Sequence, residues 1–488
     1  MEAMSAEIFI SSPLVVLGFG AILLLLTDVF IPTGWSRSIL SGLFVLLSLS
    51  LLISNASLYT PGKCIFSEAL FADPFAFFST LFILLGLFLL ILLGFTRSKE
   101  AKTEQSAEFY SLLFFSAMGG IVLASASELL SLFLGLELMS LSLYCLCAAK
   151  RYNRNSTEAA LKYFILGSFS SAFLLLGIAV VFGLTGSTFI NEIAADVSQI
   201  DTPLLYFGVS LFLVGMIFKV GGVPFHFWVP DVYEGAPTLL SAYMASVVKG
   251  ASVFAAIRIL CGAFGDLQFY WSNLIWITAL LSIIGGNLLA IRQNNVKRML
   301  AYSSIAHVGY LLVAFLGLKH GNETGAAASI LFYLVAYAIA SIGSFGVLHV
   351  LESMSEEQEY NGDISAFGGL AKREPILAFL MLVFLLSLAG LPPGMQGLLA
   401  KFYVFYSAVQ SGNIGITIVA VLGSAVSLYY YLRIVVQMYL LPCNAQIPSV
   451  ANKKHSSIVL IVCAAAIILF GLFPSGLHEF VSLLSESL

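Results

Sequence analysis

The segment LFLVGMIFKVGGVPFHFW, residues 211–228, decides how the rest of the chain is interpreted. It is apolar enough to lie in a bilayer, yet it contains Lys219 and a Gly-Gly-Val-Pro sequence that a continuous helix does not accommodate. A charge near the bilayer centre costs about 2.5–3.5 kcal/mol on insertion scales. Unwound backbone at membrane depth persists only where protein or a water-filled cavity surrounds it. The segment therefore predicts a broken membrane helix beside a polar path.

Three further charged residues, Glu137, Lys249 and Lys401, lie well inside long apolar runs. A lysine that lies this deep cannot easily extend its ammonium group to the membrane surface. Because burial disfavours the charged form of lysine, a buried lysine can bind and release a proton near neutral pH. Together with Lys219, these residues predict a path for protons or ions.

The composition places the chain in a membrane. Of its 488 residues, 59% are hydrophobic and only 10% are charged, whereas soluble domains carry about 25% charged residues. The N-terminal sequence MEAMSAE lacks the basic region of a cleaved signal peptide, so we expect the first apolar run to be a retained span. The six cysteines form no Cys-x-x-Cys pair and no haem attachment sequence. We therefore expect no cofactor in this chain.

Fourteen apolar segments approach the length of about 20 residues that a membrane helix needs. They cover residues 8–30, 38–54, 73–95, 107–124, 128–149, 158–184, 204–228, 236–262, 271–292, 297–317, 324–350, 375–409, 413–440 and 457–482. The twelfth is too long for one straight helix and contains Gly-Leu-Pro-Pro-Gly at 390–394. We therefore expect an all-α polytopic membrane protein in which helices 7 and 12 are broken.

The basic residues predict the orientation of these spans. Of the 22 lysines and arginines, fourteen fall in or beside the loops on one side, two fall in the loops on the other side and six fall within spans. Cytoplasmic loops of membrane proteins are enriched in lysine and arginine. This asymmetry predicts that both termini lie on the opposite, periplasmic side, and it supports an even number of spans.

The two expected breaks also predict an internal repeat. An offset of five helices, from helix 7 to helix 12, would invert the second copy relative to the membrane. Inverted repeats with broken helices at corresponding positions are typical of transporter cores. We expect an N-terminal three-helix region at 1–106, a first five-helix repeat at 107–262, a second at 263–440 and a final helix within 441–488.

Two histidines and a further lysine are candidate proton relays. His226 lies two residues after the proline of the first break, and His307 lies inside the tenth span. Histidine changes its charge near neutral pH, although a lone histidine on an apolar helix is often only hydrogen-bonded to backbone. Lys162 lies four residues after Glu158, which suits either an ordinary helix ion pair or a point where protons enter.

Glu137 and Lys219 suggest how such a path is controlled. A carboxylate near a buried lysine stabilises the charged form of that lysine. If Glu137 moves towards or away from Lys219, the lysine takes up or loses its proton, so the two residues and one mobile helix would form a switch.

Several segments resemble the antiporter-like subunits of respiratory NADH-quinone oxidoreductase (complex I), most closely the subunit N type. The resemblance covers nearly the whole chain. The segments that carry it are DPFA at 73–76, LGLEL at 134–138, EAALKY at 158–163, FK at 218–219, VPDVYEGAPT at 229–238, NLLA at 287–290, KRMLAYSSIAH at 297–307 and SLAGLPP at 387–393.

The resemblance implies roles for the same buried residues. It assigns to proton transfer the fifth-helix glutamate and the lysines of helices 7, 8 and 12, which are here Glu137, Lys219, Lys249 and Lys401. Lys162 and His226 match further channel positions of that family. A lysine at 401, where the M type has glutamate, favours the N type. The L type has a long lateral helix after its last span, and we expect none here because the sequence ends soon after residue 482. Residues 394–398, Gly-Met-Gln-Gly-Leu, depart from the Gly-Phe pair that is usual in the family.

The resemblance further implies an activity, partners and a location. It implies a proton-translocating membrane subunit of an enzyme whose FMN, iron–sulfur clusters and quinone belong to other subunits. The expected partners are an M-type neighbour, the small K-, J-, A- and H-type subunits and the lipid bilayer of a bacterial inner membrane, without nucleic acid. Two alternatives stay open: a subunit of a multisubunit sodium/proton antiporter, which would act without NADH or quinone, and a structural anchor, which would tolerate neutralised charges.

Overall fold

The structure of the chain is a computed structural model that describes residues 2–28, 30, 34–95, 106–150, 153–318, 323–353, 362–442 and 454–486. Some of the residues used above lie outside these ranges. They are the loop charges Arg97, Lys99, Lys102, Arg151, Lys319 and Lys453, together with Cys443 and the terminal residues Met1 and Leu488.

The described residues are almost all helical. The first half contains α1 (Glu2–Ile10), α2 (Ser12–Thr27), α3 (Gly34–Ser54), β1 (Cys64–Ile65), β2 (Leu70–Phe71), α4 (Pro74–Leu93), α6 (Ala107–Ser125), α7 (Leu129–Cys147), α8 (Arg154–Thr185), α9 (Ile190–Val197), α10 (Pro203–Val220), α11 (Trp228–Gly235), α12 (Thr238–Tyr243) and α13 (Lys249–Cys261). The second half contains α14 (Gln268–Ile291), α15 (Val296–Phe315), α16 (Glu323–Glu352), α17 (Leu370–Arg373), α18 (Pro375–Ala389), α19 (Met395–Gln410), α20 (Ile414–Tyr439), α21 (Lys454–Leu472) and α22 (Pro474–Ser485).

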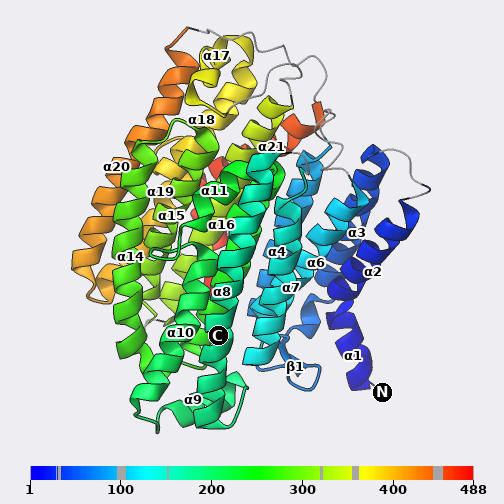
Figure 1. Cartoon of the computed structure of the whole chain (residues 1–488), viewed down its shortest axis with the longest axis vertical. Helices are drawn as coiled ribbons and strands as arrows, with labels where there is room; N and C mark the ends of the chain where they lie inside the picture. The colour runs from blue at the N-terminus through cyan, green and yellow to red at the C-terminus, as the bar shows by residue number, and fades with distance from the viewer. Residues whose placement is uncertain are drawn as a thin grey trace.

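Most of the helices run side by side along the long axis of the molecule and form one bundle (Figure 1). α2 and α3 lie at one edge of this bundle, and α20 lies at the opposite edge. Many leucine, isoleucine and phenylalanine side chains on the outer helices are exposed, for example on α8 and α20. Such a surface suits lipid or neighbouring membrane helices, because water would be an unfavourable solvent for it.

Each of the fourteen expected spans contains a helix, and the all-α polytopic fold is confirmed. Among the described residues, eleven helices are long and apolar enough to cross a membrane, and a bent pair, Ile458–Leu472 with Pro474–Ser485, makes up to twelve. The helices α2 and α18 are apolar but shorter. The last expected span, 457–482, is not one straight helix, because α21 and α22 meet at an angle of 86°. The count of fourteen crossings stays a prediction.

Both expected helix breaks are present. α10 ends at Gly221, whose φ of 79° is in the left-handed region, and α11 starts only at Trp228. α18 ends at Gly390, whose φ is 83°, and α19 starts at Met395. At each glycine the amide donates to carbonyls three and four residues earlier, and the next amide closes the same turn. A non-glycine residue is strained in this conformation, which explains why glycine ends both helices.

Close helix pairs recur at the positions where a five-helix repeat would place them. In α6 and α7, Gly119 and Gly135 leave each other's backbone no room for a Cβ atom. In α14 and α15, Gly286 leaves no room for a Cβ atom against the backbone of Ala306, and Gly309 leaves none against Ile283. Small residues allow membrane helices to approach closely. The matched pairs and the matched breaks support the inverted repeat, which, like the boundaries at 106/107, 262/263 and 440/441, we keep as a proposal.

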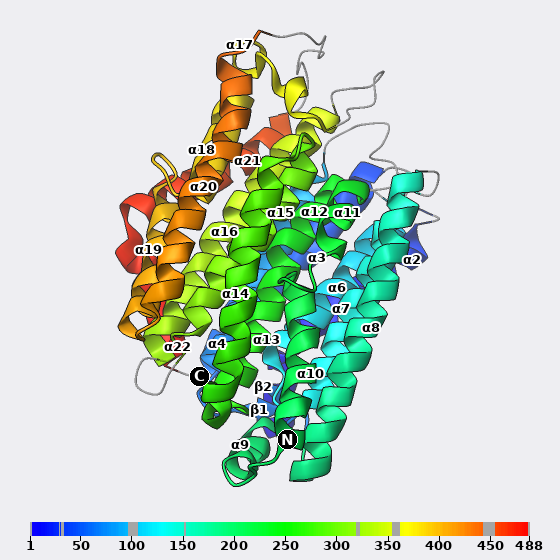
Figure 2. The same ribbon diagram turned by 60° about the vertical axis from the view of Figure 1, so that its left-hand side comes forward.

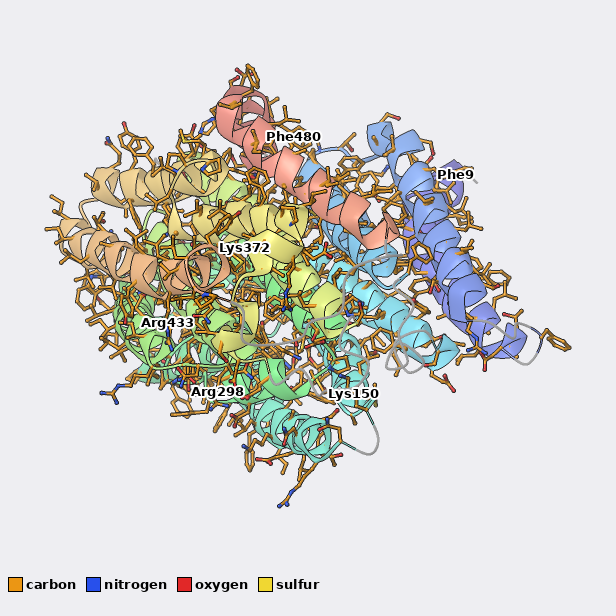
Figure 3. All side chains as sticks on the ribbon, turned by 90° about the horizontal axis from the view of Figure 1, so that it is seen from above. Phe9, Lys150, Arg298, Lys372, Arg433 and Phe480 are labelled. Atoms are coloured by element: carbon orange, nitrogen blue, oxygen red, sulfur yellow. The ribbon has the colours of Figure 1, made fainter. Side chains whose placement is uncertain are left out.

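The two ends of the bundle differ. The β1–β2 hairpin, α9 and the start of α1 lie at one end, and α17 lies at the other (Figure 1). α22 also lies in the half that contains the hairpin (Figure 2). Seen from the α17 end, Figure 3 shows the labelled basic residues Lys150, Arg298, Lys372 and Arg433 among the loops. We therefore propose that this end is the cytoplasmic side.

A buried ion pair joins the first helices to the body of the bundle. Asp73 begins α4 and accepts a hydrogen bond from the Ala76 amide at 2.7 Å. The same carboxylate binds both terminal nitrogens of Arg258 in α13, at 2.7 and 2.9 Å. The Arg258 Nε atom donates to the Ala124 carbonyl of α6 at 3.3 Å. Arg258 is thus a structural residue that holds three helices together.

Candidate functional site

Lys219 lies on the last turn of α10, directly before the first break. Its side chain is buried, with 4% of the residue exposed. The ammonium group donates to the Ser140 hydroxyl at 2.7 Å and to the Tyr144 hydroxyl at 3.4 Å, both on α7. Phe218 and Tyr144 present their rings to the same ammonium at 5.8 and 5.7 Å. The lysine is therefore held by hydroxyl groups and aromatic rings.

Glu137 lies on α7, three residues before Ser140 and on the same helix face. Its half-buried carboxylate accepts a hydrogen bond from the Ser171 hydroxyl of α8. Within the described part of the chain, Glu137 and Lys219 form no ion pair at 4.0 Å or less, although their charges interact electrostatically. The structure therefore places the expected pair close together but out of contact, with Ser140 between them along the helix.

Lys249 starts α13, immediately after a π-helical turn over Met244–Val248. It is 4% exposed. Its ammonium donates to the Ser304 carbonyl at 3.1 Å, to the Ser304 hydroxyl and to the Tyr337 hydroxyl at 3.5 Å. The wider π turn changes the direction in which the residues after it, starting with Lys249, point from the helix. Such turns often occur at functional positions.

Lys401 lies on α19, and its side chain reaches back across the second break to the end of α18. Its ammonium donates to the Ala389 carbonyl, at the end of α18, at 2.9 Å. It also donates to the Ser424 hydroxyl of α20 at 2.8 Å and lies 5.3 Å from the centre of the Tyr310 ring. Because Gly390 ends α18 in the left-handed conformation, the Ala389 carbonyl has no further helical partner and is free to bind the lysine.

His307 lies between Lys249 and Lys401. One ring nitrogen, Nδ1, lies 2.6 Å from the Tyr333 hydroxyl, and the other, Nε2, lies 3.1 Å from the Tyr431 hydroxyl. A neutral imidazole donates from one nitrogen and accepts at the other, so this geometry suits a histidine that passes a proton between two hydroxyls.

Two small cavities meet at this histidine. One cavity is lined by Lys249 and His307, and the other is lined by Lys401 and His307. Both also contain Tyr333 and Tyr337 in their walls. His307 therefore lies in the wall of both cavities, with Lys249 lining one of them and Lys401 the other.

Among the described residues, the remaining two candidates, Lys162 and His226, form no hydrogen bond or ion pair with the buried lysines. Lys162 binds Glu158 at 2.8 Å and Asp231 at 2.7 Å and is partly exposed. The ordinary helix ion pair is thus present, as part of a larger network that includes Arg298. Burial acts to raise the pKa of the Asp231 carboxyl, but hydrogen bonds from Lys162 and Arg298 hold that pKa below its ordinary value.

His226 lies in the first break, with 9% of the residue exposed. Its Nδ1 atom is buried and has no hydrogen-bond partner among the described residues. Its ring packs against that of Phe227 at a tilt of 31°, with 4.5 Å between the ring centres. This position lies on unwound backbone beside the break.

Sequence reasoning missed the hydroxyl groups around the charges. They belong to Ser140, Tyr144, Ser304, Tyr333, Tyr337, Ser424 and Tyr431. Tyr333 and Tyr337 are four residues apart in an apolar span, which could have been noticed, because a buried tyrosine usually finds a hydrogen-bond partner. Among the described residues, no cluster of three His, Cys, Asp or Glu side chains is arranged to hold a metal ion.

The chain is similar to known proteins both in its sequence and in its fold. Residues 126–427 match the family model described as "NADH:quinone oxidoreductase/Mrp antiporter, TM". The chain is 39% identical to NADH-quinone oxidoreductase subunit N of Trichlorobacter lovleyi, over 96% of this chain and 95% of that protein. It is also 39% identical to the subunit N of Myxococcus xanthus, over 95% of this chain and 94% of the other.

Two solved structures extend the comparison. The fold matches a chain of respiratory complex I from Thermus thermophilus with a TM-score of 0.80 and 32% identity, covering 96% of this chain and 98% of that one. It also matches a chain of the Mrp complex from a Dietzia species with a TM-score of 0.81, covering 99% and 97% of the two chains. The identity to the Mrp chain is only 18%, so that likeness concerns the fold alone.

Proposed function

Since the chain belongs to the NADH-quinone oxidoreductase subunit N family, we propose that it carries protons across the membrane as a subunit of that enzyme, through its buried lysines. Electron transfer from NADH to quinone takes place in other subunits, which hold FMN, iron–sulfur clusters and the quinone. This chain contributes side chains that bind, hold and release protons. The activity is therefore that of a translocase subunit without a redox centre of its own.

The observation that carries this proposal is the line of proton-binding side chains from Lys249 through His307 to Lys401. The three residues lie on α13, α15 and α19, and His307 shares one cavity wall with Lys249 and another with Lys401. Within the described residues none of the three forms an ion pair at 4.0 Å or less. A permanent structural role would pair such charges, because an unpaired buried charge is costly. A role in proton transfer requires them to alternate between charged and neutral forms.

The hydroxyl groups make this alternation possible. A serine or tyrosine hydroxyl donates one hydrogen bond and accepts others, so it can bind either form of a lysine. Ser304 and Tyr337 serve Lys249, and Ser424 serves Lys401. Between them, Tyr333 and Tyr431 hold the two ring nitrogens of His307. A proton can therefore move along short steps, with water in the two cavities completing the path.

The Glu137–Lys219 pair would control the supply of protons to this path. Ser140 binds the lysine and lies one helical turn from the carboxylate on α7. A small movement of α7 relative to α10 would change the distance between the two charges, and with it the preferred protonation state of the lysine. Conformational or electrostatic changes that arrive along the membrane arm would act on this pair. Lys162 and His226 would contribute at the edges of the path.

The expected partners and location follow from the same family membership. The chain would assemble with other membrane subunits of the enzyme, including an M-type neighbour and the small K-, J-, A- and H-type subunits. It would lie in the inner membrane of a bacterium, with α17 on the cytoplasmic side and both termini on the periplasmic side. The exposed apolar faces of the outer helices would meet lipid and these neighbours.

A subunit of a sodium/proton antiporter is the second candidate, because the fold of the Mrp chain matches as well as that of the complex I chain. The two candidates differ in what drives transport. An antiporter subunit would exchange sodium for protons in vesicles without NADH or quinone. The proposed function requires quinone reduction.

The test is the number of protons pumped per NADH oxidised in membrane vesicles that carry Lys249→Met. We expect the variant complex to assemble and to pump fewer protons, because methionine keeps the side-chain bulk but cannot bind a proton. Lys372→Met, at an exposed position on the α17 end, is the matched control and should pump normally. Normal pumping by an assembled Lys249→Met complex would refute the proposal, and sodium-driven proton movement without NADH would favour the antiporter.

A further inference from the structure

Asn287 is a buried amide on α14 that connects three helices. The residue is 2% exposed and begins the segment Asn-Leu-Leu-Ala at 287–290. Its Nδ2 atom donates to the Tyr310 hydroxyl of α15 at 2.9 Å and to the Ile283 carbonyl of its own helix at 2.8 Å. Its Oδ1 atom accepts a hydrogen bond from the Tyr430 hydroxyl of α20 at 3.1 Å. Both hydrogens and the oxygen of the amide are thus in use, which fixes its orientation.

The ring of Tyr310 lies against Lys401. The ammonium group is 5.3 Å from the ring centre, within the distance of about 6 Å at which a cation and an aromatic ring attract each other. The ring also packs edge-on against Phe405, one turn after the lysine on α19, with 6.1 Å between the ring centres. It contacts the His307 ring at 5.6 Å. Tyr310 therefore binds the Asn287 amide with its hydroxyl and contacts the lysine and the histidine with its ring.

Two adjacent residues of α20 fit these contacts. A Cβ atom at Gly423 would lie 3.1 Å from Asn287 Nδ2 and 3.4 Å from the Tyr310 hydroxyl oxygen. The next residue, Ser424, accepts a hydrogen bond from the Lys401 ammonium at 2.8 Å. The glycine therefore leaves room for the bond between asparagine and tyrosine, and the serine binds the lysine.

The hydrogen bond to Asn287 determines where the Tyr310 ring can lie. A buried tyrosine hydroxyl usually has a hydrogen-bond partner. Because this partner is on α14, the ring is held at both ends, by its own backbone and by its hydroxyl. Without the partner, the hydroxyl would turn towards another polar group, and the ring would move away from the ammonium. The attraction between a cation and a ring is stronger where water is excluded, so the position of the ring affects how well the charged lysine is stabilised.

We infer that Asn287 is a positioning residue for Lys401: its amide holds the Tyr310 ring against the ammonium group and so helps to set the balance between the charged and the neutral lysine. The inference rests on the proposed function. Asn287 itself neither binds nor releases a proton. It would act only through the ring, which distinguishes it from the side chains that carry protons.

The other groups that face Lys401 stay the same when Asn287 is changed. The last turn of α18 provides the Ala389 carbonyl, and α20 provides the Ser424 hydroxyl. The titratable side chains that face the lysine from the other packed helices are Tyr310 and His307 of α15 and Tyr333 and Tyr337 of α16. Among the described residues, α21 adds none to the wall of this cavity. A change in the pH dependence of an Asn287 variant therefore reports on the ring.

The test measures protons pumped per NADH oxidised across a range of pH in assembled complexes. Tyr310→Leu removes the ring, so the lysine should lose its proton more easily, and pumping should decline at a pH lower by about 1 unit than in the wild type. Asn287→Leu leaves the tyrosine hydroxyl unpaired and should give part of this shift. Asn273→Leu is the matched control, because this exposed asparagine of α14 also donates to the carbonyl four residues earlier, at 3.0 Å. Its pH profile should be that of the wild type.

A double variant tests whether the ring is the cause. Asn287→Leu with Tyr310→Phe keeps an aromatic ring beside Lys401 but leaves no unpaired hydroxyl on it. Replacing both partners of a buried hydrogen bond by apolar groups disturbs a protein much less than removing one of them. The pH profile of the double variant should therefore return towards that of the wild type. A double variant shifted as far as Asn287→Leu alone would show that the inference is wrong.

A purely structural role gives a different result. Asn287→Leu would then lower the amount of assembled subunit, but the assembled complex would have the same pH profile as Asn273→Leu, and this outcome would overturn the inference. If Asn287→Leu fails to assemble, Tyr310→Leu and Asn287→Ser decide, because serine is too short to reach the tyrosine, and a wild-type profile in either would overturn it. Lys401→Met separates the two levels: normal pumping there refutes the proposed function, whereas its loss together with an unshifted profile in Asn287→Leu refutes only the inference.

Discussion

The three lysines Lys219, Lys249 and Lys401 are each bound by a serine hydroxyl, whereas the buried Lys297 pairs with the Glu352 carboxylate at 3.6 Å. Ser140 binds Lys219, Ser304 binds Lys249 and Ser424 binds Lys401. Within the described residues, no carboxylate lies within 4.0 Å of any of the three ammonium groups. A carboxylate would hold a lysine permanently in its charged form. The serines stabilise the lysines without removing their ability to change charge, which is what a relay needs.

The first prediction concerns Glu137 and Lys219. Lys219→Met should lower proton pumping in an assembled complex, and Glu137→Gln should do so too, because each removes one half of the proposed switch. Glu137→Asp keeps the charge on a shorter arm and should retain part of the activity. The double variant Glu137→Gln with Lys219→Met should pump about as well as the poorer single variant, since residues in one network are not additive. Losses that multiply independently in vesicle assays would show that the two residues serve separate steps.

At the scale of helices, the left-handed glycines set where the lysines lie. Gly390 ends α18 and frees the carbonyl that binds Lys401, and a Cβ atom at this position would lie 3.3 Å from Lys401 Cδ. Gly412 has nearly the same φ, 82°, but a Cβ atom there would meet nothing within 4 Å. The two glycines therefore separate backbone strain from an effect on the lysine.

The second prediction uses this pair. Gly390→Ala and Gly412→Ala should each cost about 1–2 kcal/mol of stability, because alanine is strained in the left-handed region. Only Gly390→Ala should also lower the number of protons pumped per NADH oxidised, because it crowds Lys401. Thermal stability and pumping are measured on the same vesicles. Equal pumping by the two variants would mean that the second break does not position the lysine.

The third prediction concerns the Asp73–Arg258 pair, which joins α4, α6 and α13. Arg258→Met should destabilise the subunit by about 3–5 kcal/mol, because it leaves the buried Asp73 carboxylate without its partner. The loss should appear as a lower melting temperature or a lower amount of assembled subunit. Asp73→Asn together with Arg258→Met should recover part of the stability, since no unpaired charge then remains. A melting temperature unchanged by Arg258→Met would contradict the structural role.

The sequence allowed much of the helix arrangement to be predicted, because the signals are local. Apolar runs located the helices, and Gly221, Gly390 and the nearby prolines located both breaks. The bend between α21 and α22 was missed although Pro474 marks it. The π turn before Lys249 could not be predicted, because packing of neighbouring helices and not local preference determines it.

The site was predicted only in part, because the sequence shows local signals but not which helices contact one another. Charged residues in apolar runs are conspicuous, so the four charges and His307 were found. Their hydroxyl partners lie on other helices, and only the packed bundle shows that Tyr431 of α20 reaches His307 of α15. The same limit applies to Lys162, for which the bundle supplies Asp231 as a second partner.

At the scale of the whole molecule, the chain is a polarised bundle. Basic residues gather at the α17 end, while the β1–β2 hairpin and α9 lie at the other end (Figures 1 and 3). Glu137, Lys219 and Lys249 lie in the proposed first repeat, 107–262, whereas His307 and Lys401 lie in the proposed second repeat, 263–440. The path would thus cross from one repeat to the other, and the switch would lie wholly in the first repeat, where α10 packs against α13.

The fourth prediction tests the orientation of this bundle. Alkaline phosphatase fused after Leu488 should be active, because the distribution of basic residues places the C-terminus on the periplasmic side. A fusion at Lys372, at the α17 end, should be inactive and serves as the control. An inactive phosphatase at 488 combined with an active cytoplasmic reporter at the same point would overturn both the orientation and the even number of spans.

The most direct test of the central claim is the number of protons pumped per NADH oxidised by Lys249→Met, Lys401→Met and the double variant, each measured after confirming that the subunit is assembled. If Lys249, His307 and Lys401 form one path, each single variant should lose the contribution of that path, and the double variant should lose no more than either single variant. Wild-type pumping in the double variant, or a loss in the double variant that equals the sum of two separate losses, would contradict the account.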